Sequence, residues 1–278
     1  MITLEQINNI KIEEIKVKEP KFRSHPDIFN WFFQVILLIG NRGMGKTTIS
    51  LNLLRLQRPH IDKLYILSPN ANTDRKILEV IKDFDYDLYD ELTEEIIDNI
   101  KEDIDRRIKL YQDAEKLYKI IKKKKKILTE EDEDFLEDLD IEDIEQMIEL
   151  YKKGRPPTST IWLSDMVGHK LLHDRNGPLV KMIIKNRHRY LTALIETQNM
   201  KSVAPPIRKC ASVFMIAPTM DYNYRKQIYE EVEGVIPTLE LFHEILDKVA
   251  ETPHQFLTIF NDGSTKQITI NLDKKIII

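Results

Sequence analysis

Residues 33–54 have the sequence FQVILLIGNRGMGKTTISLNLL, and this stretch decides the fold of the chain. Residues 33–39 are apolar except for Gln34, which is typical of a strand buried on both faces of a parallel sheet. Residues 48–54 place apolar side chains at spacings that favour a helix. Between the predicted strand and helix, residues 40–47 (GNRGMGKT) satisfy the pattern G-x-x-x-x-G-K-[ST] without a mismatch.

This pattern is that of a P-loop, in which the main chain between a strand and a helix wraps around the phosphates of a nucleotide. Its glycines let successive N–H groups point at the anion, and the positive end of the helix dipole faces the same anion. Lys46 can reach the β- and γ-phosphates, and the Thr47 hydroxyl can hold Mg²⁺. The sequence therefore predicts ATP and Mg²⁺ as cofactors, bound by Gly40, Asn41, Arg42, Gly43, Met44, Gly45, Lys46, Thr47 and Thr48.

The composition narrows the class of protein. The chain has 278 residues and a formal net charge of −4, so no overall positive field attracts nucleic acid and any contact to DNA must come from local patches. Cys210 is the only cysteine, which excludes an intramolecular disulfide and fits a reducing compartment. The sequence shows no N-terminal signal and no apolar run near the ~18 residues that span a bilayer. We therefore expect a soluble intracellular protein that is neither secreted nor inserted in a membrane.

Apolar segments elsewhere in the chain predict the rest of the fold. Segments 60–68, 159–163, 191–198 and 212–217 are predicted to be strands with helices between them. This alternation predicts an α/β fold, a P-loop NTPase with a mostly parallel central sheet. We also expect an edge strand within residues 1–30, helices at 73–81, from Pro178, at 222–232 and at 239–249, and a C-terminal hairpin of residues 256–260 and 267–272 that turns at 262–263.

Residues 83–155 differ in composition from the rest of the chain. Residues 122–126 are all lysine, and residues 129–146 hold eleven acidic residues and no basic one. We interpret 83–155 as a charged helical insertion on the surface, and the alternative is that the lysine run contacts nucleic acid or a partner. The chain would then be a single P-loop ATPase domain, residues 1–278, with a core of 28–82 and 156–220, the insertion 83–155, and C-terminal helices and a β-hairpin at 221–278.

Two further polar residues follow predicted strands. Asp165 comes after the strand 159–163, and a P-loop ATPase needs a carboxylate at the end of a neighbouring strand. We predict that Asp165 supplies it, and its role stays open between holding Mg²⁺ and orienting the attacking water. Gln198 ends the next strand, and its amide can donate to a γ-phosphate and accept from a water, which suits a sensor of the hydrolysis state.

Three segments together carry a family resemblance, namely GNRGMGKTT, WLSDM, and NRHRYLTALIETQNMKSVAPPIRKCASVFMIAP. They resemble the genome-packaging ATPases of poxviruses and other large DNA viruses, with relatives in virophages and Polinton-type elements. These ATPases belong to the FtsK–HerA group of DNA-pumping P-loop enzymes, within the ASCE class. The most specific parts are Arg187-His188, Gln198, and the Pro-Pro-Ile-Arg that ends at Arg208. Family members usually carry two adjacent acids where this chain has Ser164-Asp165.

The resemblance implies an ATP-driven motor that translocates double-stranded DNA of any sequence into a preformed capsid. It implies a homo-oligomeric ring and a capsid or portal-vertex protein as a partner. It also implies a location in the host cytoplasm or viral factory, or in the virion.

Hydrolysis in a ring also needs a cation that neutralises charge on the γ-phosphate. The candidates are Arg42, Arg187, Arg189 and Arg208. We predict Arg208, acting on a neighbouring subunit, because it follows the sensor strand at a place that could face that subunit.

Two other functions remain open. A small-molecule or nucleoside kinase would be expected to show a short arginine-rich lid, whereas the insertion here is acidic and lysine-rich. A non-catalytic scaffold that keeps an ATP site is the third possibility, because the second acid beside Asp165 is missing. A GTPase is disfavoured, since the sequence has no Asn-Lys-x-Asp motif.

Overall fold

Strand β1 (Val35–Ile39), which precedes the P-loop, lies inside a β-sheet, and each of its residues is buried. The computed structural model describes residues 33–122, 129–166, 168–218, 221–261 and 267–276. Within these residues the sheet has nine strands. Their order across the sheet is β3 (Tyr86–Tyr89), β2 (Lys63–Leu67), β4 (Ser159–Leu163), β5 (Leu191–Thr197), β1, β6 (Val213–Ile216), β7 (Leu257–Phe260), β8 (Gln267–Ile270) and β9 (Lys274–Ile276).

Every pair of neighbouring strands from β3 to β6 is parallel, and β7, β8 and β9 complete the sheet in antiparallel orientation. The predicted α/β fold of a P-loop NTPase with a mostly parallel sheet is therefore confirmed. The parallel strands all end at one edge, here called the carboxyl edge, and all begin at the opposite amino edge. Strand β5 lies between β1 and β4, so β5 is the direct neighbour of the P-loop strand.

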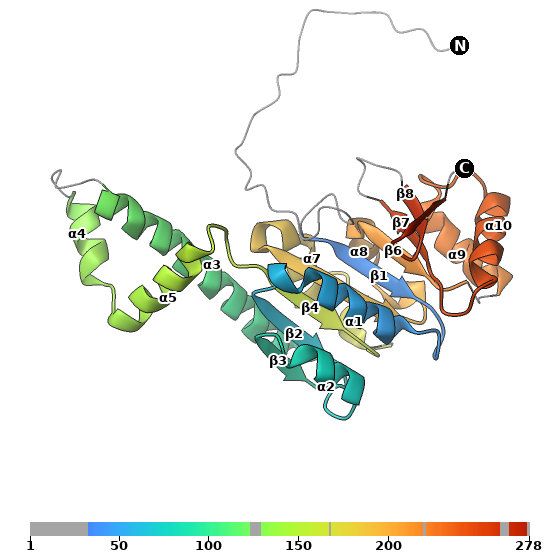
Figure 1. Cartoon of the computed structure of the whole chain (residues 1–278), viewed down its shortest axis with the longest axis horizontal. Helices are drawn as coiled ribbons and strands as arrows, with labels where there is room; N and C mark the ends of the chain where they lie inside the picture. Colours follow the sequence, from blue (N-terminus) through green and yellow to red (C-terminus); the bar gives the residue numbers. More distant parts are fainter. Residues whose placement is uncertain (1–32, 123–128, 167, 219–220, 262–266, 277–278) are drawn as a thin grey trace, which may run out of the picture.

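Helices cover both faces of this sheet (Figure 1). Helices α1 (Lys46–Gln57) and α2 (Arg75–Ile81) lie together on one face, and α7 (Pro178–Ile184), α8 (Pro205–Cys210) and the first half of α3 (Glu94–Lys122) lie on the other. Helix α10 (Leu239–Ala250) packs beside β7, with α9 (Tyr222–Val232) against it. The short helices are η1 (Arg58–His60), α6 (Lys170–His173), η2 (Asn186–Arg189) and η3 (Met200–Ser202).

Residues 83–155 are largely helical as predicted, but they do not lie wholly outside the sheet. Strand β3 pairs with β2 at the edge of the sheet and was not predicted. An edge strand is only partly buried, so its sequence YDLY lacks the run of apolar residues that marks a buried strand. For this reason β3 does not stand out from the charged segment around it. Ile97, Ile100 and Ile104 in the first half of α3 are buried in the main core. The segment outside the body of the sheet therefore begins within α3.

The second half of α3 forms, with α4 (Glu130–Glu137) and α5 (Ile141–Lys152), a helical arm that projects from the sheet (Figure 1). This arm is defined here as the described residues from 110 to 152. It has a small core of its own, in which Leu110, Ala114 and Met147 are buried. Few apolar side chains hold the arm together, so its helices depend largely on their own caps and propensities.

The arm is attached to the amino edge of the sheet through Asp62, which precedes β2. The Asp62 carboxylate accepts hydrogen bonds from Lys153 Nζ at 2.8 Å, from Arg155 Nη1 at 2.6 Å and from the Thr158 amide at 2.8 Å. Its side chain is only 5% exposed. Burial opposes the ionisation of Asp62, but these hydrogen bonds outweigh it, so the pKa of Asp62 lies below its ordinary value. This carboxylate therefore anchors the return of the chain from the arm to the sheet.

The other predicted elements are present with small shifts at their ends. Predicted strands 60–68, 159–163, 191–198 and 212–217 correspond to β2, β4, β5 and β6, and predicted helices correspond to α2, α7, α9 and α10. The C-terminal hairpin is formed by β7 and β8, and β9 was not predicted. The edge strand expected within residues 1–30, the turn at 262–263 and residues 123–126 of the lysine run lie outside the described residues.

Candidate functional site

The loop between β1 and α1 has the geometry of an anion cradle. A Cβ added to Gly40 would lie 2.7 Å from the Cβ of Ala217, so even alanine would force the two chain segments apart. Gly45 adopts a left-handed φ of 92°, which residues with a side chain disfavour. Helix α1 then begins at Lys46, and among the described residues no side chain caps its first turn. Its first N–H groups and its dipole are therefore available to an anion.

Lys46 spans this loop. Its Nζ donates to the carbonyl oxygens of Gly40 at 2.8 Å and of Asn41 at 3.2 Å. Burial lowers the pKa of Lys46, and the negative charges of Glu196 and Asp165 partly offset this effect. An ammonium group held over the loop in this way can transfer its hydrogen bonds to phosphate oxygens.

The remaining predicted loop residues surround this centre. Arg42 and Gly43 are exposed at the tip of the loop, and Met44 is half-buried against the main core. Thr47 and Thr48 lie in the first turn of α1, with Thr48 exposed.

The carboxylate next to Thr47 belongs to Glu196 in β5, which was not among the predicted site residues. Thr47 Oγ1 donates to Glu196 Oε2 at 3.2 Å, and Ser164 Oγ donates to the same oxygen at 3.1 Å. Ser50 Oγ at 2.6 Å and Trp162 Nε1 at 2.9 Å donate to Oε1. These five side chains form a buried polar cluster beneath the start of α1, and we call them the Glu196 cluster.

The strand register explains how the cluster forms. Glu196 pairs with Leu38 of β1 on one side, and on the other side Trp162 of β4 pairs with Leu194. Side chains alternate along a strand, so Trp162, Ser164 and Glu196 point to one face of the sheet. A signal for this site was present in the sequence, because Glu196 is the only charged residue of β5 and a charge in a buried strand requires partners.

Glu196 is 1% exposed, and the four groups that donate hydrogen bonds to it are uncharged. Burial raises the pKa of Glu196, although hydrogen bonds from Ser50, Trp162 and Ser164 and the charge of Lys46 act in the opposite direction. Both carboxylate oxygens therefore accept hydrogen bonds, and within the described part of the chain no cationic side chain is among the donors.

Asp165, the predicted acid, lies farther from the P-loop than expected. It follows β4, and β5 separates β4 from β1, so the prediction that Asp165 ends a neighbouring strand is wrong. Asp165 is exposed and has a left-handed φ of 55°. This backbone conformation costs roughly 1 kcal/mol in residues with a side chain, although Asp tolerates it better than most. The charge of Asp165 still acts on Lys46, so both groups belong to the same electrostatic environment.

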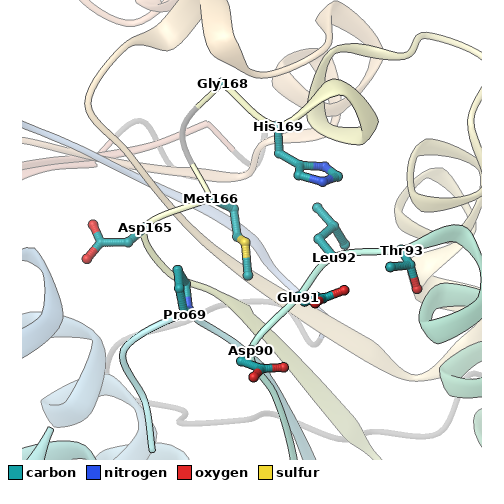
Figure 2. A pocket seen from close by; sticks show the side chains of 9 residues that line it. All are labelled: Pro69, Asp90, Glu91, Leu92, Thr93, Asp165, Met166, Gly168 and His169. Atoms are coloured by element: carbon teal, nitrogen blue, oxygen red, sulfur yellow. The ribbon is translucent and has the colours of Figure 1, made fainter. Parts of the chain in front are cut away.

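A cavity of about 520 Å³ opens at the carboxyl edge beside Asp165 (Figure 2). Its lining comes from the segments that follow β2, β3 and β4, namely Pro69, Asp90, Glu91, Leu92, Thr93, Asp165, Met166, Gly168 and His169. Figure 2 shows the Asp165 carboxylate pointing away from the other labelled side chains. Asp165 therefore borders the cavity without pointing into it.

Gln198, the predicted sensor residue, follows β5 directly and lies beside the P-loop. The Gly40 amide donates to the Thr197 carbonyl at 3.1 Å, which joins the end of β5 to the start of the loop. Gln198 is half-buried, and its carbonyl accepts a hydrogen bond from the Tyr224 hydroxyl at 2.5 Å. The main chain that presents the Gln198 amide group is thus held in place.

Arg208 is paired within its own chain. Its Nε donates to Glu231 at 2.7 Å and its Nη1 donates to the Val203 carbonyl at 2.7 Å. The side chain is 15% exposed. These contacts give Arg208 a role in tying α8 to α9, and a reach into a neighbouring subunit would require both contacts to break.

The other candidate arginines lie in two places. Arg187 and Arg189 belong to η2 at the amino edge, where Arg189 makes two hydrogen bonds to Asp105 of α3. Arg42 is exposed in the P-loop itself. Of the four predicted candidates, Arg42 is the one that lies at the chain's own phosphate cradle.

The donor groups at the carboxyl edge fit Mg²⁺ bound together with a nucleotide. The Thr47 hydroxyl and the carboxylates of Glu196 and Asp165 are oxygen groups, which this hard cation prefers. Mg²⁺ in nucleotide sites takes one or two protein groups and completes its shell with phosphate oxygens and water.

No helix in the described part of the chain is both long and apolar enough to cross a membrane.

No protein-family model matches the chain, and no curated protein matches its sequence. Similar solved structures include the genome packaging NTPase B204 from Sulfolobus turreted icosahedral virus 2 in complex with ATP-gammaS, with 16% identity over 88% of this chain and 98% of that chain and a TM-score of 0.46. The conjugation coupling protein TcpA of pCW3 shows 12% identity over 84% of this chain and 59% of that chain, with a TM-score of 0.41. EssC (ATPases 2 and 3) from Geobacillus thermodenitrificans shows 16% identity over 66% of this chain and 32% of that chain, with a TM-score of 0.41. Likenesses at these levels assign no function to the chain.

Proposed function

We propose that this chain is a P-loop ATPase, which binds ATP with Mg²⁺ at the carboxyl edge of its sheet and hydrolyses the γ-phosphate. One observation carries the proposal: a complete phosphate loop, a buried lysine and two carboxylates meet at the same edge. Lys46 lies in the loop and within the electrostatic reach of both Glu196 and Asp165. P-loop enzymes that split ATP need these same kinds of groups.

Each group has a task that follows from its place. The N–H groups of the loop and of the first turn of α1 bind phosphate oxygens. Lys46 leaves the loop carbonyls for the β- and γ-phosphates, and Gln198 contacts the γ-phosphate from the end of β5. The exposed Asp165 carboxylate orients the attacking water. Bound Mg²⁺ would neutralise charge that develops on the phosphate oxygens.

The finer function that we propose is the packaging of double-stranded DNA into a preformed viral capsid. The protein would act as a homo-oligomeric ring on DNA of any sequence, against a capsid or portal-vertex protein, in the host cytoplasm or viral factory or within the virion. Support comes from the motif resemblance, in which Arg187-His188, Gln198 and Arg208 are the most specific residues.

The test is ATP turnover of the full chain with and without double-stranded DNA. For a motor we expect turnover to rise with DNA of unrelated sequences, to rise with protein concentration, and to lose the DNA effect as salt screens the phosphates. Turnover that ignores DNA and protein concentration, with phosphate passed to a small acceptor, would show a kinase. ATP binding without turnover under every condition would show a scaffold that only binds ATP.

A further inference from the structure

We propose that Glu196 is the positioning residue for Mg²⁺, because it fixes the Thr47 hydroxyl in the orientation that a metal ligand needs. The inference deepens the proposed ATPase function and rests on it, since the cation binds here together with the nucleotide. In this arrangement Glu196 of β5 orients Thr47 as the ligand of Mg²⁺, and Asp165 orients the attacking water.

The first support is the direction of the hydrogen bond between Thr47 and Glu196. A hydroxyl group carries one proton and two lone pairs, so a threonine that binds a cation must direct its proton elsewhere. Here the proton goes to Glu196, because Thr47 Oγ1 donates to the carboxylate Oε2 over 3.2 Å. The carboxylate cannot donate in return when ionised, so the hydroxyl keeps its lone pairs for other ligands.

The second support is the fixed orientation of the carboxylate. Trp162 Nε1 can only donate, and together with Ser50 it occupies Oε1. Oε2 is thereby left to Thr47 and Ser164. With the side chain of Glu196 buried, water does not compete for these bonds. Hydrogen-bonded partners of this kind orient metal ligands in proteins.

The third support is charge. The hydrogen bonds to Glu196 come from hydroxyl and indole groups, whereas the Lys46 ammonium donates to the loop carbonyls of Gly40 and Asn41. None of the donors to Glu196 from the described residues is cationic, and burying a charged carboxylate among uncharged groups raises the free energy of the folded protein. A divalent cation bound beside Thr47 would lower that cost.

The β4 segment brings no acid to the Glu196 cluster. Its two residues that face the cluster are Trp162 and Ser164, which donate to Glu196 over 2.9 Å and 3.1 Å and carry no charge. Asp165 is the next residue, and it is exposed in a left-handed conformation outside the cluster. Glu196 therefore supplies, from the neighbouring strand, the carboxylate that Ser164 lacks.

The experiment measures how much Mg²⁺ strengthens ADP binding, by titration calorimetry on the full chain with and without Mg²⁺. Glu196→Gln keeps the size of the side chain. Because Trp162 requires the amide oxygen, the amide nitrogen faces Thr47 and reverses the hydrogen bond. We expect the gain in affinity from Mg²⁺ to fall about tenfold or more, as for other residues that orient metal ligands. Metal-free ADP affinity should stay close to wild type. Asp90→Asn, which changes an exposed acid at the same edge of the sheet, is the matched control and should keep the full gain.

An unchanged Mg²⁺ gain in Glu196→Gln, in a protein that melts cooperatively, would overturn the inference. Wild-type protein that binds no ADP would instead overturn the proposed ATPase function, so the two failures are distinguishable. If Glu196 acts through Thr47, then Glu196→Gln should add no further loss of the Mg²⁺ gain to Thr47→Val. Additive losses would overturn the positioning role.

A second variant keeps the test usable if Glu196→Gln does not fold. The double variant Glu196→Gln with Ser164→Asp returns a carboxylate to the cluster from β4, at a position whose hydroxyl already lies 3.1 Å from Glu196 Oε2. We expect this variant to fold and to recover the Mg²⁺ gain. A folded double variant without the gain would contradict the inference.

Discussion

Two buried carboxylates lie at opposite edges of the same sheet, and they differ in the charge of their partners. Asp62 at the amino edge accepts hydrogen bonds from Lys153 and Arg155, whereas the donors to Glu196 at the carboxyl edge are hydroxyl and indole groups. Burial opposes the ionisation of both. The cationic partners prevail at Asp62, whose pKa is lowered, while the pKa of Glu196 is raised.

This difference separates a carboxylate that stabilises the fold, Asp62, from one that we propose acts in the nucleotide site, Glu196. The charge of Asp62 is neutralised within the chain, and its function is to hold the arm to the sheet. The carboxylate of Glu196 lies beside a phosphate loop, and its hydrogen-bond donors among the residues that the structure describes are all uncharged. Substitutions of the site residues at the carboxyl edge should therefore affect ATP binding or hydrolysis, and substitution of Asp62 at the amino edge should affect stability.

The largest expected effect is that of Lys46→Ala at the carboxyl edge. The variant removes the ammonium group that reaches the β- and γ-phosphates, so we expect ATP turnover to be abolished and ATP binding to be weakened. Phosphate release and nucleotide titration measure the two effects. Lys201→Ala, an exposed lysine that follows β5 at the same edge, is the control and should turn over ATP like the wild type. Wild-type turnover in Lys46→Ala would refute the ATPase proposal.

Asp165→Asn should have the next largest effect. Its geometry is kept while the charge that orients the attacking water is lost, so turnover should fall on the order of 10²–10⁴-fold. Nucleotide binding should be retained. Asp90→Asn changes another exposed acid of the same cavity and should leave turnover near the wild-type value. Equal losses in the two variants would show that general negative charge in the cavity, and not Asp165, matters.

Asp62→Asn tests the amino edge. The variant removes the anionic partner of the largely buried Arg155, whose Nη1 keeps hydrogen bonds to the Pro156 carbonyl and the Thr158 hydroxyl. We expect the free energy of unfolding to fall by about 2 kcal/mol, less than for a fully buried pair because Lys153 is 45% exposed. Urea unfolding measures this change, and turnover at a temperature where the variant is folded should stay near wild type. Asp247→Asn is the control: this carboxylate, 68% exposed, pairs with Arg225, and its loss should cost less than about 1 kcal/mol.

The pH dependence of the same variant gives the smallest and most specific effect. Because the pKa of Asp62 is lower in the folded protein than the ordinary value of about 3.9, its stabilisation is present above that value. It is lost as pH falls through the folded-state pKa. The difference in unfolding free energy between wild type and Asp62→Asn should therefore be constant from about pH 5 to 8 and shrink below about pH 4. A difference that grows in acid would contradict this assignment.

The P-loop and its flanking elements could be predicted because their signal is local. A buried strand, a glycine pattern and a helix follow one another within residues 33–54, and the chemistry depends on main-chain N–H groups that any such loop presents. Strand β3 escaped prediction because an edge position leaves its residues partly exposed, so no apolar pattern marks it. The order of strands across the sheet has no local signal, and for that reason the place of β5 beside β1 was not anticipated.

The partners of the site residues could not be predicted, because they are distant in sequence. Ser50 lies 146 positions from Glu196, and Trp162 lies 34 positions from it. Only the pairing of β5 with β1 and β4 brings them together. The ion pair of Arg208 with Glu231 joins residues that are 23 positions apart and lie in two helices. It gives Arg208, which was predicted to act on a neighbouring subunit, a partner within its own chain.

Helix α3 gives the molecule a mechanical connection between its two edges. It begins at Glu94, next to Thr93 in the lining of the cavity beside Asp165, and it ends in the arm. Its 29 residues contain neither glycine nor proline, so it is a continuous rod, about 44 Å long at roughly 1.5 Å per residue. A tilt of about 5° around one end of such a rod moves the other end by roughly 4 Å. The first half of α3 is buried in the main core, so a movement that tilted this helix would displace the arm farther than the part packed against the sheet.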